Sequence, residues 1–152
     1  ASLQVLGHWY EDARGARVPG MGVLDITTLP QGHRAIGELV TVPLVEGLTQ
    51  PLSGFENHGG GTILGEDAAP LGRVISGVGN GTPQGQEPAE VAYDGVVQGS
   101  IIATYMHGPA LARNPELADL LLQRATGMSL PPLEVPGVAQ LRAERLSGVQ
   151  LP

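Results

Sequence analysis

Imidazole side chains are the groups in this chain best suited to moving protons near neutral pH, where a histidine can both accept and donate one. The chain has four histidines among its 152 residues. His107 is the strongest candidate, because it follows the β-like run at residues 101–106 and precedes Gly108 and Pro109, which turn the chain. A side chain at the carboxyl end of a strand in an open α/β sheet faces the usual ligand crevice. We therefore expect His107 to be a catalytic acid and base, with a buried structural histidine as the alternative.

A second group of polar side chains lies in the segment GFENHGGGT at residues 54–62. Glu56, Asn57 and His58 stand there beside three consecutive glycines, and glycine lets backbone approach a ligand closely. The pattern indicates a candidate site loop, in which Glu56 could orient an imidazole, or else a glycine-rich turn with a surface histidine. It is not a phosphate loop, since the chain has no lysine, and GVGNG at residues 77–81 does not match the dinucleotide pattern GxGxxG.

The other two histidines, His8 and His33, have no supporting pattern, and we expect them at the surface or at a helix edge. No two histidines stand at the i, i+4 spacing of a helical metal motif, and the chain has no cysteine, so the sequence predicts no metal site. Arg34 is a fixed cation in a chain whose eight basic residues are all arginine. Taken alone, such a residue is more typical of a structural ion pair.

Charge and hydropathy exclude several classes of protein. Fifteen carboxylates against eight arginines give a net charge of −7, which repels nucleic-acid phosphates and anionic membrane surfaces. No apolar run approaches the ~20 residues that span a bilayer, and the first 25 residues lack the features of a secretory signal. We therefore expect no nucleic-acid partner, no membrane insertion and a cytoplasmic location.

Periodicity and turn residues predict one α/β domain over residues 1–152. Leu3, Leu6 and Tyr10 share a helical face, which indicates a helix over residues 1–10. A helix is also predicted from the N-cap Asn114 to Gly127, and a shorter one at residues 138–146. Strands are expected at residues 22–27, 39–45, 52–57, 73–76, 96–98 and 101–106. Of these, 39–45 is expected at an edge or a bulge because of Pro43, and 101–106 at the centre of the sheet.

Four segments together resemble one protein family over residues 1–125. They are ASLQVLGHWYE; GMGVLDITT followed by HRAIGE; GFENHGGGTILG with PLGRVISGVGNG; and TYMHGPALARNPELADLLL. The chain resembles the class I glutamine amidotransferases of the cobyric-acid-synthase type, and within them the GatD branch, the glutaminase subunits of lipid II isoglutaminyl synthases. The resemblance implies a three-layer, flavodoxin-like α/β domain. These residues would form its C-terminal part and lack the strands upstream of the nucleophile elbow.

Roles for individual residues follow from the resemblance. His107 matches the catalytic histidine of a Cys–His dyad. Gln4 and Arg34 match residues that hold the substrate L-glutamine, and the backbone N–H of Ala1 matches part of the oxyanion hole. Many class I members have a glutamate two residues after the histidine, where this chain has Pro109.

The nucleophile of the family is a cysteine that would stand immediately before Ala1, and this chain contains no cysteine. The predicted helix at residues 1–10 also lacks an N-cap. Both features lead us to expect that the chain is part of a longer protein whose nucleophile elbow precedes these residues.

The implied activity is hydrolysis of L-glutamine, with ammonia passed to a MurT-like ATP-dependent ligase subunit that amidates the D-glutamate of lipid II in peptidoglycan synthesis. The resemblance implies no metal or organic cofactor in this chain. Two alternatives stay open: a glutaminase that serves a corrinoid carboxylate, as in cobyric acid synthases, and a non-catalytic scaffold or binding subunit that keeps the fold.

Overall fold

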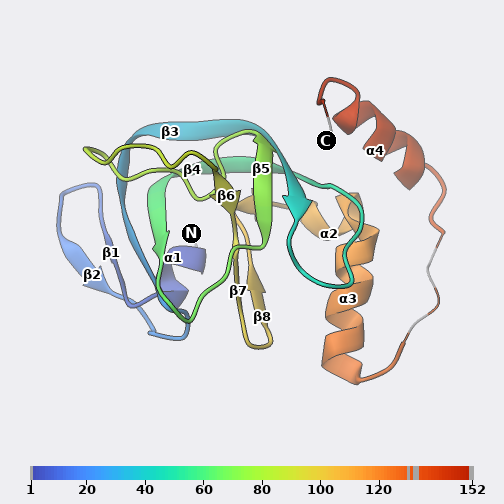
Figure 1. The fold of residues 1–152 in the computed structure, drawn as a ribbon, viewed down its shortest axis with the longest axis horizontal. Coiled ribbons are helices and arrows are strands. Elements are labelled where there is room, and N and C mark those ends of the chain that lie inside the picture. The colour runs from blue at the N-terminus through green and yellow to red at the C-terminus, as the bar shows by residue number, and fades with distance from the viewer. Residues whose placement is uncertain (1, 130, 132–133, 151–152) are drawn as a thin grey trace.

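The computed structural model describes residues 2–129, 131 and 134–150, and it has the mixed α/β composition predicted from the sequence (Figure 1). The helices are α1 (Ser2–Leu6), α2 (Ala110–Arg113), α3 (Pro115–Thr126) and α4 (Val138–Leu146). The strands are β1 (Trp9–Glu11), β2 (Arg17–Pro19), β3 (Ile26–Pro43), β4 (Leu52–Leu64), β5 (Gly72–Ser76), β6 (Tyr93–Asp94), β7 (Val96–Gln98), β8 (Ile101–Ala103) and β9 (Met106–His107). Among the described residues, no helix is long and apolar enough to cross a bilayer.

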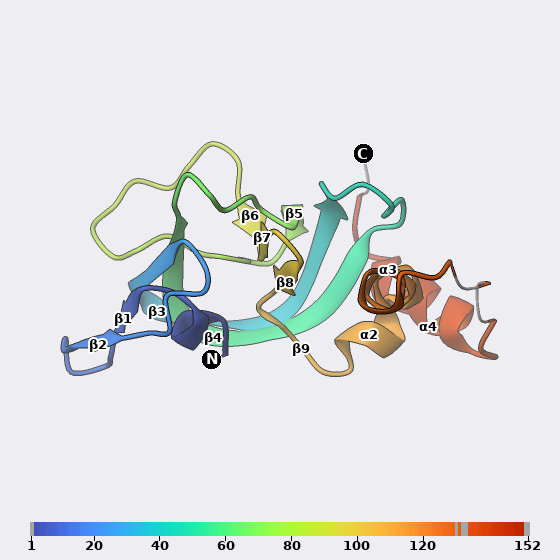
Figure 2. The same cartoon turned by 90° about the horizontal axis from the view of Figure 1, so that it is seen from below.

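The main sheet is built around the antiparallel pair β3 and β4. Its strand order is β2-β1-β3-β4-β9. In addition, β5 pairs with the end of β3, and β6 pairs with β5. The β3–β4 pairing runs from Ile26 opposite Leu64 to Thr41 opposite Leu52, with one register shift between Pro30 and Ala35. Figure 2 shows the two strands curving together, with β1 and β2 at one end and α2–α4 at the other. β7 and β8 form a separate two-stranded ribbon.

Two clusters of buried apolar side chains hold the sheet to the surrounding elements. The first joins β3, β4, β9 and α3 and consists of Leu39, Leu48, Leu52, Leu71, Met106 and Leu117. The second joins α1, β3 and β7 and consists of Leu3, Leu24, Ile26, Val96 and Tyr105. Burial of each large apolar side chain stabilises the fold by ~1.5–3 kcal/mol. The second cluster matters for the site, because it places α1 against Tyr105, two residues before His107.

Helices α3 and α4 have the predicted positions, since their limits depend on local signals. Pro115 is the first residue of α3, where its missing N–H costs nothing, and Gly127 ends the helix in the left-handed conformation with φ 71°. On α4, the Arg142 guanidinium donates hydrogen bonds to the carbonyl oxygens of Pro51 (2.9 Å) and Arg113 (2.5 Å). These bonds attach α4 to the start of β4 and to the end of α2.

The first helix is shorter than predicted. It ends at Leu6, and Trp9 begins β1, which pairs in parallel with β3. Gly7 lies so close to the backbone of Ile26 that a side chain at this position would collide with it. The chain can therefore leave the helix there and enter the sheet, and Tyr10 belongs to β1 although its spacing fits a helical face.

Two strand predictions near β3 are also wrong in detail. Residues 22–25 precede the strand, which begins at Ile26 and not at residue 22. The segment 39–45 was expected at an edge or a bulge, yet its strand part lies inside the sheet, because β3 pairs there with β4 on one side and β5 on the other. A register shift between Val40 and Thr41 in the pairing with β5 does fit the bulge alternative.

The run at residues 101–106 does not form a central strand. β8 takes its first three residues and pairs with β7 alone, whereas β9 lies at the edge of the main sheet and pairs with β4. Between the two strands, the carboxylate of Asp94 accepts hydrogen bonds from the Thr104 hydroxyl (2.5 Å) and from the Tyr105 N–H (3.3 Å). These contacts turn the backbone and divide the run.

Candidate functional site

His107 is the last residue of the short edge strand β9. It lies opposite Phe55 of β4, and its side chain is exposed, which does not fit the alternative of a buried histidine. Its Nδ1 lies 2.8 Å from the carbonyl oxygen of Tyr105. Because a carbonyl oxygen can only accept, Nδ1 carries the hydrogen in this bond. In the neutral ring, Nε2 is then an unprotonated base.

Tyr105 is the most connected side chain near His107. It is 1% exposed, and its hydroxyl lies 2.7 Å from the Thr62 hydroxyl. The Gln4 amide nitrogen donates to the same hydroxyl at a longer distance of 3.5 Å. Burial raises the pKa of the Tyr105 hydroxyl, so it stays protonated and can donate a hydrogen bond. Gln4 on α1 and His107 on β9 are thus both in contact with one buried residue.

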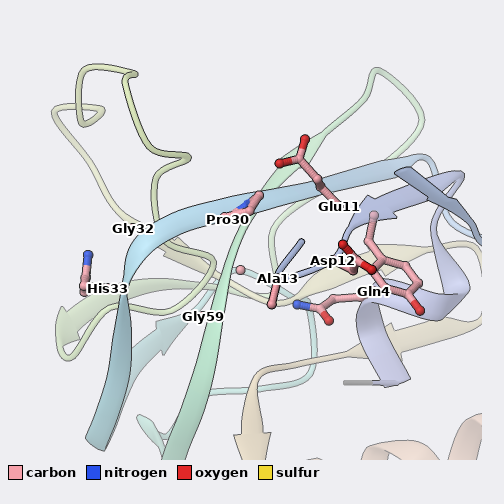
Figure 3. A pocket seen from close by; sticks show the side chains of 10 residues that line it. Gln4, Glu11, Asp12, Ala13, Pro30, Gly32, His33 and Gly59 are labelled. Carbon is pink, nitrogen blue, oxygen red and sulfur yellow. The ribbon is translucent and has the colours of Figure 1, made fainter. Parts of the chain in front are cut away.

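Gln4 also lines an open pocket of about 490 Å³ between the β1 region and the middle of the β3–β4 pair (Figure 3). The polar side chains around this pocket come from Gln4, Tyr10, Glu11, Asp12 and His33. Gly59 and Gly60 form part of its wall, and the Gln4 amide occupies the space that a side chain at Gly60 would need. The sequence predicted Gln4 here only by resemblance. It did not predict His33 at this pocket, where His33 is exposed as expected and is one of the lining residues.

Arg34 lies beside His33 on β3 and is exposed. Its Nε donates a hydrogen bond of 2.7 Å to the Asn57 side-chain oxygen on β4. The terminal nitrogens of the guanidinium point to no hydrogen-bond acceptor among the described residues, so they are available to an anionic group.

Glu56, Asn57 and His58 do not form a loop. They lie within β4, which continues through the three glycines to Leu64, so the prediction of a site loop is wrong, and so is the alternative of a turn. The reason is that β3 supplies a pairing partner for each of these residues, which the local sequence does not show. Along β4, Glu56 and His58 point to the buried side, and Asn57 points to the more exposed side.

Glu56 is a buried carboxylate that holds the GVGNG segment. Its two oxygens accept hydrogen bonds from the N–H groups of Val78 (2.7 Å) and Gly79 (2.9 Å). The N–H groups of Val78 and Gly79 in this glycine-rich turn therefore bind the carboxylate of Glu56. This contact accounts for a glycine pattern that fits no nucleotide motif.

His58 lies between Glu56 and Tyr105 and is 3% exposed. Its ring stacks on the Tyr105 ring with 3.7 Å between centroids, and its Nδ1 lies 3.0 Å from the Gly60 carbonyl oxygen. Nδ1 therefore carries a hydrogen, and Nε2 faces Glu56 Oε2 at 3.4 Å. Nε2 makes no hydrogen bond among the described residues, so its contact with Glu56 is one of proximity. Glu56 thus lies beside His58 and not beside His107.

The structure brings some of the predicted residues together and keeps others apart. His107 lies opposite Phe55, on the same face of β4 as Asn57 and its partner Arg34. Gln4 lies against the opposite face, beside Gly60, and reaches His107 only through Tyr105. Ala1 lies outside the described residues.

Sequence reasoning missed Tyr105 and Asp94. Asp94 is fully buried, and this burial raises the pKa of its carboxyl group to about 6, although the Thr104 hydroxyl and the Tyr105 N–H partly oppose the shift. Tyr105 stands two residues before His107, a spacing at which a backbone carbonyl can meet the ring, and this was the one available signal. Nothing near Asp94 in the sequence indicated burial. Over the described residues, no three His, Cys, Asp or Glu side chains converge as metal ligands would.

The family model of the CobB/CobQ-like glutamine amidotransferase domain matches residues 1–115. The chain belongs to this family. The curled sheet and the helices fit this assignment, and together they confirm the predicted fold class, a flavodoxin-like α/β amidotransferase domain.

Curated relatives in this family carry two kinds of name. The lipid II isoglutaminyl synthase (glutamine-hydrolyzing) subunit GatD of Streptococcus pneumoniae is 38% identical over 81% of this chain and 44% of its own length. The GatD subunit of Staphylococcus aureus is 33% identical over 94% of this chain and 55% of its own length. A cobyric acid synthase of Pelotomaculum thermopropionicum is 37% identical over 86% of this chain and 26% of its own length. The chain thus spans about half the length of the GatD relatives.

Proposed function

We propose that this chain carries the histidine-bearing part of a glutaminase that hydrolyses L-glutamine to glutamate and ammonia. Family membership supports the reaction class, and the observation that carries the proposal is the hydrogen bond from His107 Nδ1 to the Tyr105 carbonyl oxygen. This bond leaves Nε2 unprotonated on an exposed side chain, which is the state that a general base needs.

The chemistry also requires a thiolate, and these 152 residues contain no cysteine. We therefore propose that the nucleophile lies outside them. His107 takes the proton of the cysteine thiol, and the resulting thiolate attacks the side-chain amide carbon of glutamine. His107 then returns that proton to the nitrogen as the C–N bond breaks, which releases ammonia and leaves a thioester. Water, deprotonated by His107, then cleaves the thioester and gives glutamate. The Ala1 N–H would stabilise the oxyanion, and no step needs a metal or an organic cofactor.

Arg34 and Gln4 are proposed to hold the substrate. The guanidinium of Arg34 has its terminal donors open to the α-carboxylate of glutamine, while its Nε is held by Asn57. Gln4 lines the pocket beside Gly59 and Gly60, which neither His107 nor Arg34 lines, so its part in holding the substrate rests on the resemblance alone. The candidate segment Glu56–His58 contributes through Asn57 and through the packing of His58 on Tyr105.

The ammonia is proposed to pass to a MurT-like ATP-dependent ligase that amidates the D-glutamate of lipid II. Two GatD relatives support this acceptor, because they are named as glutamine-hydrolyzing subunits of lipid II isoglutaminyl synthase. The cobyric acid synthase relative keeps a corrinoid carboxylate as the second candidate acceptor. The predicted cytoplasmic location stays a prediction.

The test uses the protein expressed from its complete gene (the gene-encoded protein), alone and with the ATP-dependent ligase encoded beside it. Release of glutamate from L-glutamine is measured first, and then amidation of lipid II and of a corrinoid carboxylate. We expect glutamine hydrolysis, with nitrogen transfer to lipid II. Transfer to the corrinoid alone would establish the second acceptor. No hydrolysis under any condition would favour a non-catalytic binding subunit and overturn the proposal.

A further inference from the structure

The His107 ring has one hydrogen-bond partner among the described residues, and that partner is a backbone carbonyl. The distance from Nδ1 to the Tyr105 oxygen is 2.8 Å. The buried carboxylates nearby are engaged elsewhere: Glu56 accepts from Val78 and Gly79, and Asp94 accepts from Thr104 and Tyr105. The orientation of the imidazole, which enzymes often fix with a carboxylate, depends here on where the Tyr105 backbone lies.

Four contacts of Tyr105, one from its backbone and three from its side chain, fix the position of the residue. Its N–H donates to Asp94, its hydroxyl bonds to Thr62, and its ring stacks on His58. The ring also packs with Leu3 of α1 in a buried apolar cluster. A side chain that is 1% exposed and bonded on several sides has little freedom to move. The carbonyl that faces His107 is therefore fixed relative to both β4 and α1.

We infer that Tyr105 is a positioning residue for His107. Its carbonyl oxygen selects the Nδ1–H tautomer and leaves Nε2 as the base, while its buried ring and hydroxyl set the place of that carbonyl relative to α1 and Gln4. The functional part of this inference rests on the proposed glutaminase. The tautomer part concerns the protein alone and can be tested without any activity.

The first measurement is the ¹⁵N NMR spectrum of the neutral histidine rings in the gene-encoded protein, with the His107 signals assigned by their loss in His107→Ala. We expect Nδ1 to be the protonated nitrogen of the neutral ring and Nε2 the unprotonated one. In free histidine the opposite tautomer prevails, so this result requires the protein to select it. A neutral His107 with its hydrogen on Nε2 would overturn the inference, even if the protein hydrolyses glutamine.

The second measurement compares Tyr105→Leu, which removes the ring stacking and the hydroxyl, with Tyr105→Phe, which removes the hydroxyl alone. We expect Tyr105→Leu to lower kcat for glutamine hydrolysis by on the order of 10²-fold, with a smaller change in KM, because the base loses its orientation. Tyr105→Phe should recover much of that loss. The fraction of Nδ1–H tautomer should fall in the same order.

Tyr93→Phe is the matched control, since it removes a tyrosine hydroxyl from a side chain that is 40% exposed. It should keep the wild-type kcat and the wild-type tautomer. If Tyr105→Leu does not fold, Tyr105→Phe and the wild-type spectrum still decide the question. Wild-type kcat and an unchanged tautomer in folded Tyr105→Leu would overturn the positioning role. Absence of activity in the wild type, with the tautomer as expected, would instead overturn the proposed function alone.

Discussion

Asp94 is the carboxyl group whose ionisation depends most clearly on the fold. It is fully buried beside Tyr105, and burial raises the pKa of its carboxyl group from 3.8 to about 6. Between pH 3.8 and about pH 6, the folded protein therefore keeps a proton on Asp94 that the unfolded chain has already released. Stability from this group is fully present below the lower pKa and is lost as the pH rises through the upper one.

Replacing Asp94 with asparagine tests this linkage. We expect wild-type stability to decline between about pH 4 and pH 6.5 through this carboxyl group, and we expect Asp94→Asn to flatten that part of the decline. The urea midpoint of the gene-encoded protein, measured at several pH values, provides the comparison.

Asp25→Asn is the control for that experiment. Hydrogen bonds from the Asp67 N–H and from His8 hold the pKa of the partly exposed Asp25 carboxyl below its usual value, so its contribution is lost only as the pH falls. The decline between pH 4 and pH 6.5 should therefore persist in Asp25→Asn. An identical pH profile for wild type and Asp94→Asn would show that the Asp94 carboxyl does not titrate in this range.

At the scale of elements, Asn114 connects β4, α2 and α3. It was predicted as the N-cap of α3, and it stands at that position without capping the helix by its side chain. Its amide instead pairs with the backbone of Ser53, accepting from the N–H and donating to the carbonyl at 2.8 Å each, and it donates to the Ala110 carbonyl as well. The Asn114 side chain thus makes the same pair of hydrogen bonds to Ser53 that the backbone of a neighbouring strand would make.

We predict that Asn114→Ala lowers the free energy of unfolding by about 2–4 kcal/mol, because two buried backbone groups of Ser53 lose their partners. Denaturant unfolding of the gene-encoded protein measures this change. Gln123→Ala, at an exposed position of α3, should change stability by less than ~0.5 kcal/mol. Equal effects of the two substitutions would rule out a special role for Asn114.

The sequence predicted elements well where the signals were local. Pro115 and Gly127 mark the ends of α3, and α4 needed only its own periodicity. The strands depended on partners far along the chain. Residues 59–61 look like a turn but belong to β4, because β3 pairs with Gly60 and Gly61. Residues 101–106 look like one strand but divide where they meet Asp94.

The candidate site was predictable to the same degree. His107 followed from its chemistry and its place after a β-like run, while the roles of Gln4 and Arg34 needed the resemblance to a family. Tyr105 and Asp94 were not predictable, because their importance comes from burial and from contacts that only the folded chain creates.

At the scale of the whole molecule, the curved β3–β4 pair extends from β1 and β2 at one end to α2–α4 at the other (Figure 2). β1 and α1 lie near the pocket that contains Gln4, and α2–α4 lie beyond β9. The family match covers residues 1–115, so the site and the sheet belong to the shared domain, while α4 lies outside the matched region.

The central claim is that His107 is the base of a glutaminase site, and the most direct test is the rate of glutamate release from L-glutamine by the gene-encoded protein with its ligase partner. We predict that His107→Ala lowers kcat by on the order of 10²–10⁴-fold and leaves partner binding intact. His8→Ala, the same substitution at an exposed histidine paired with Asp25, should keep the wild-type rate. Wild-type turnover in folded His107→Ala would contradict the account.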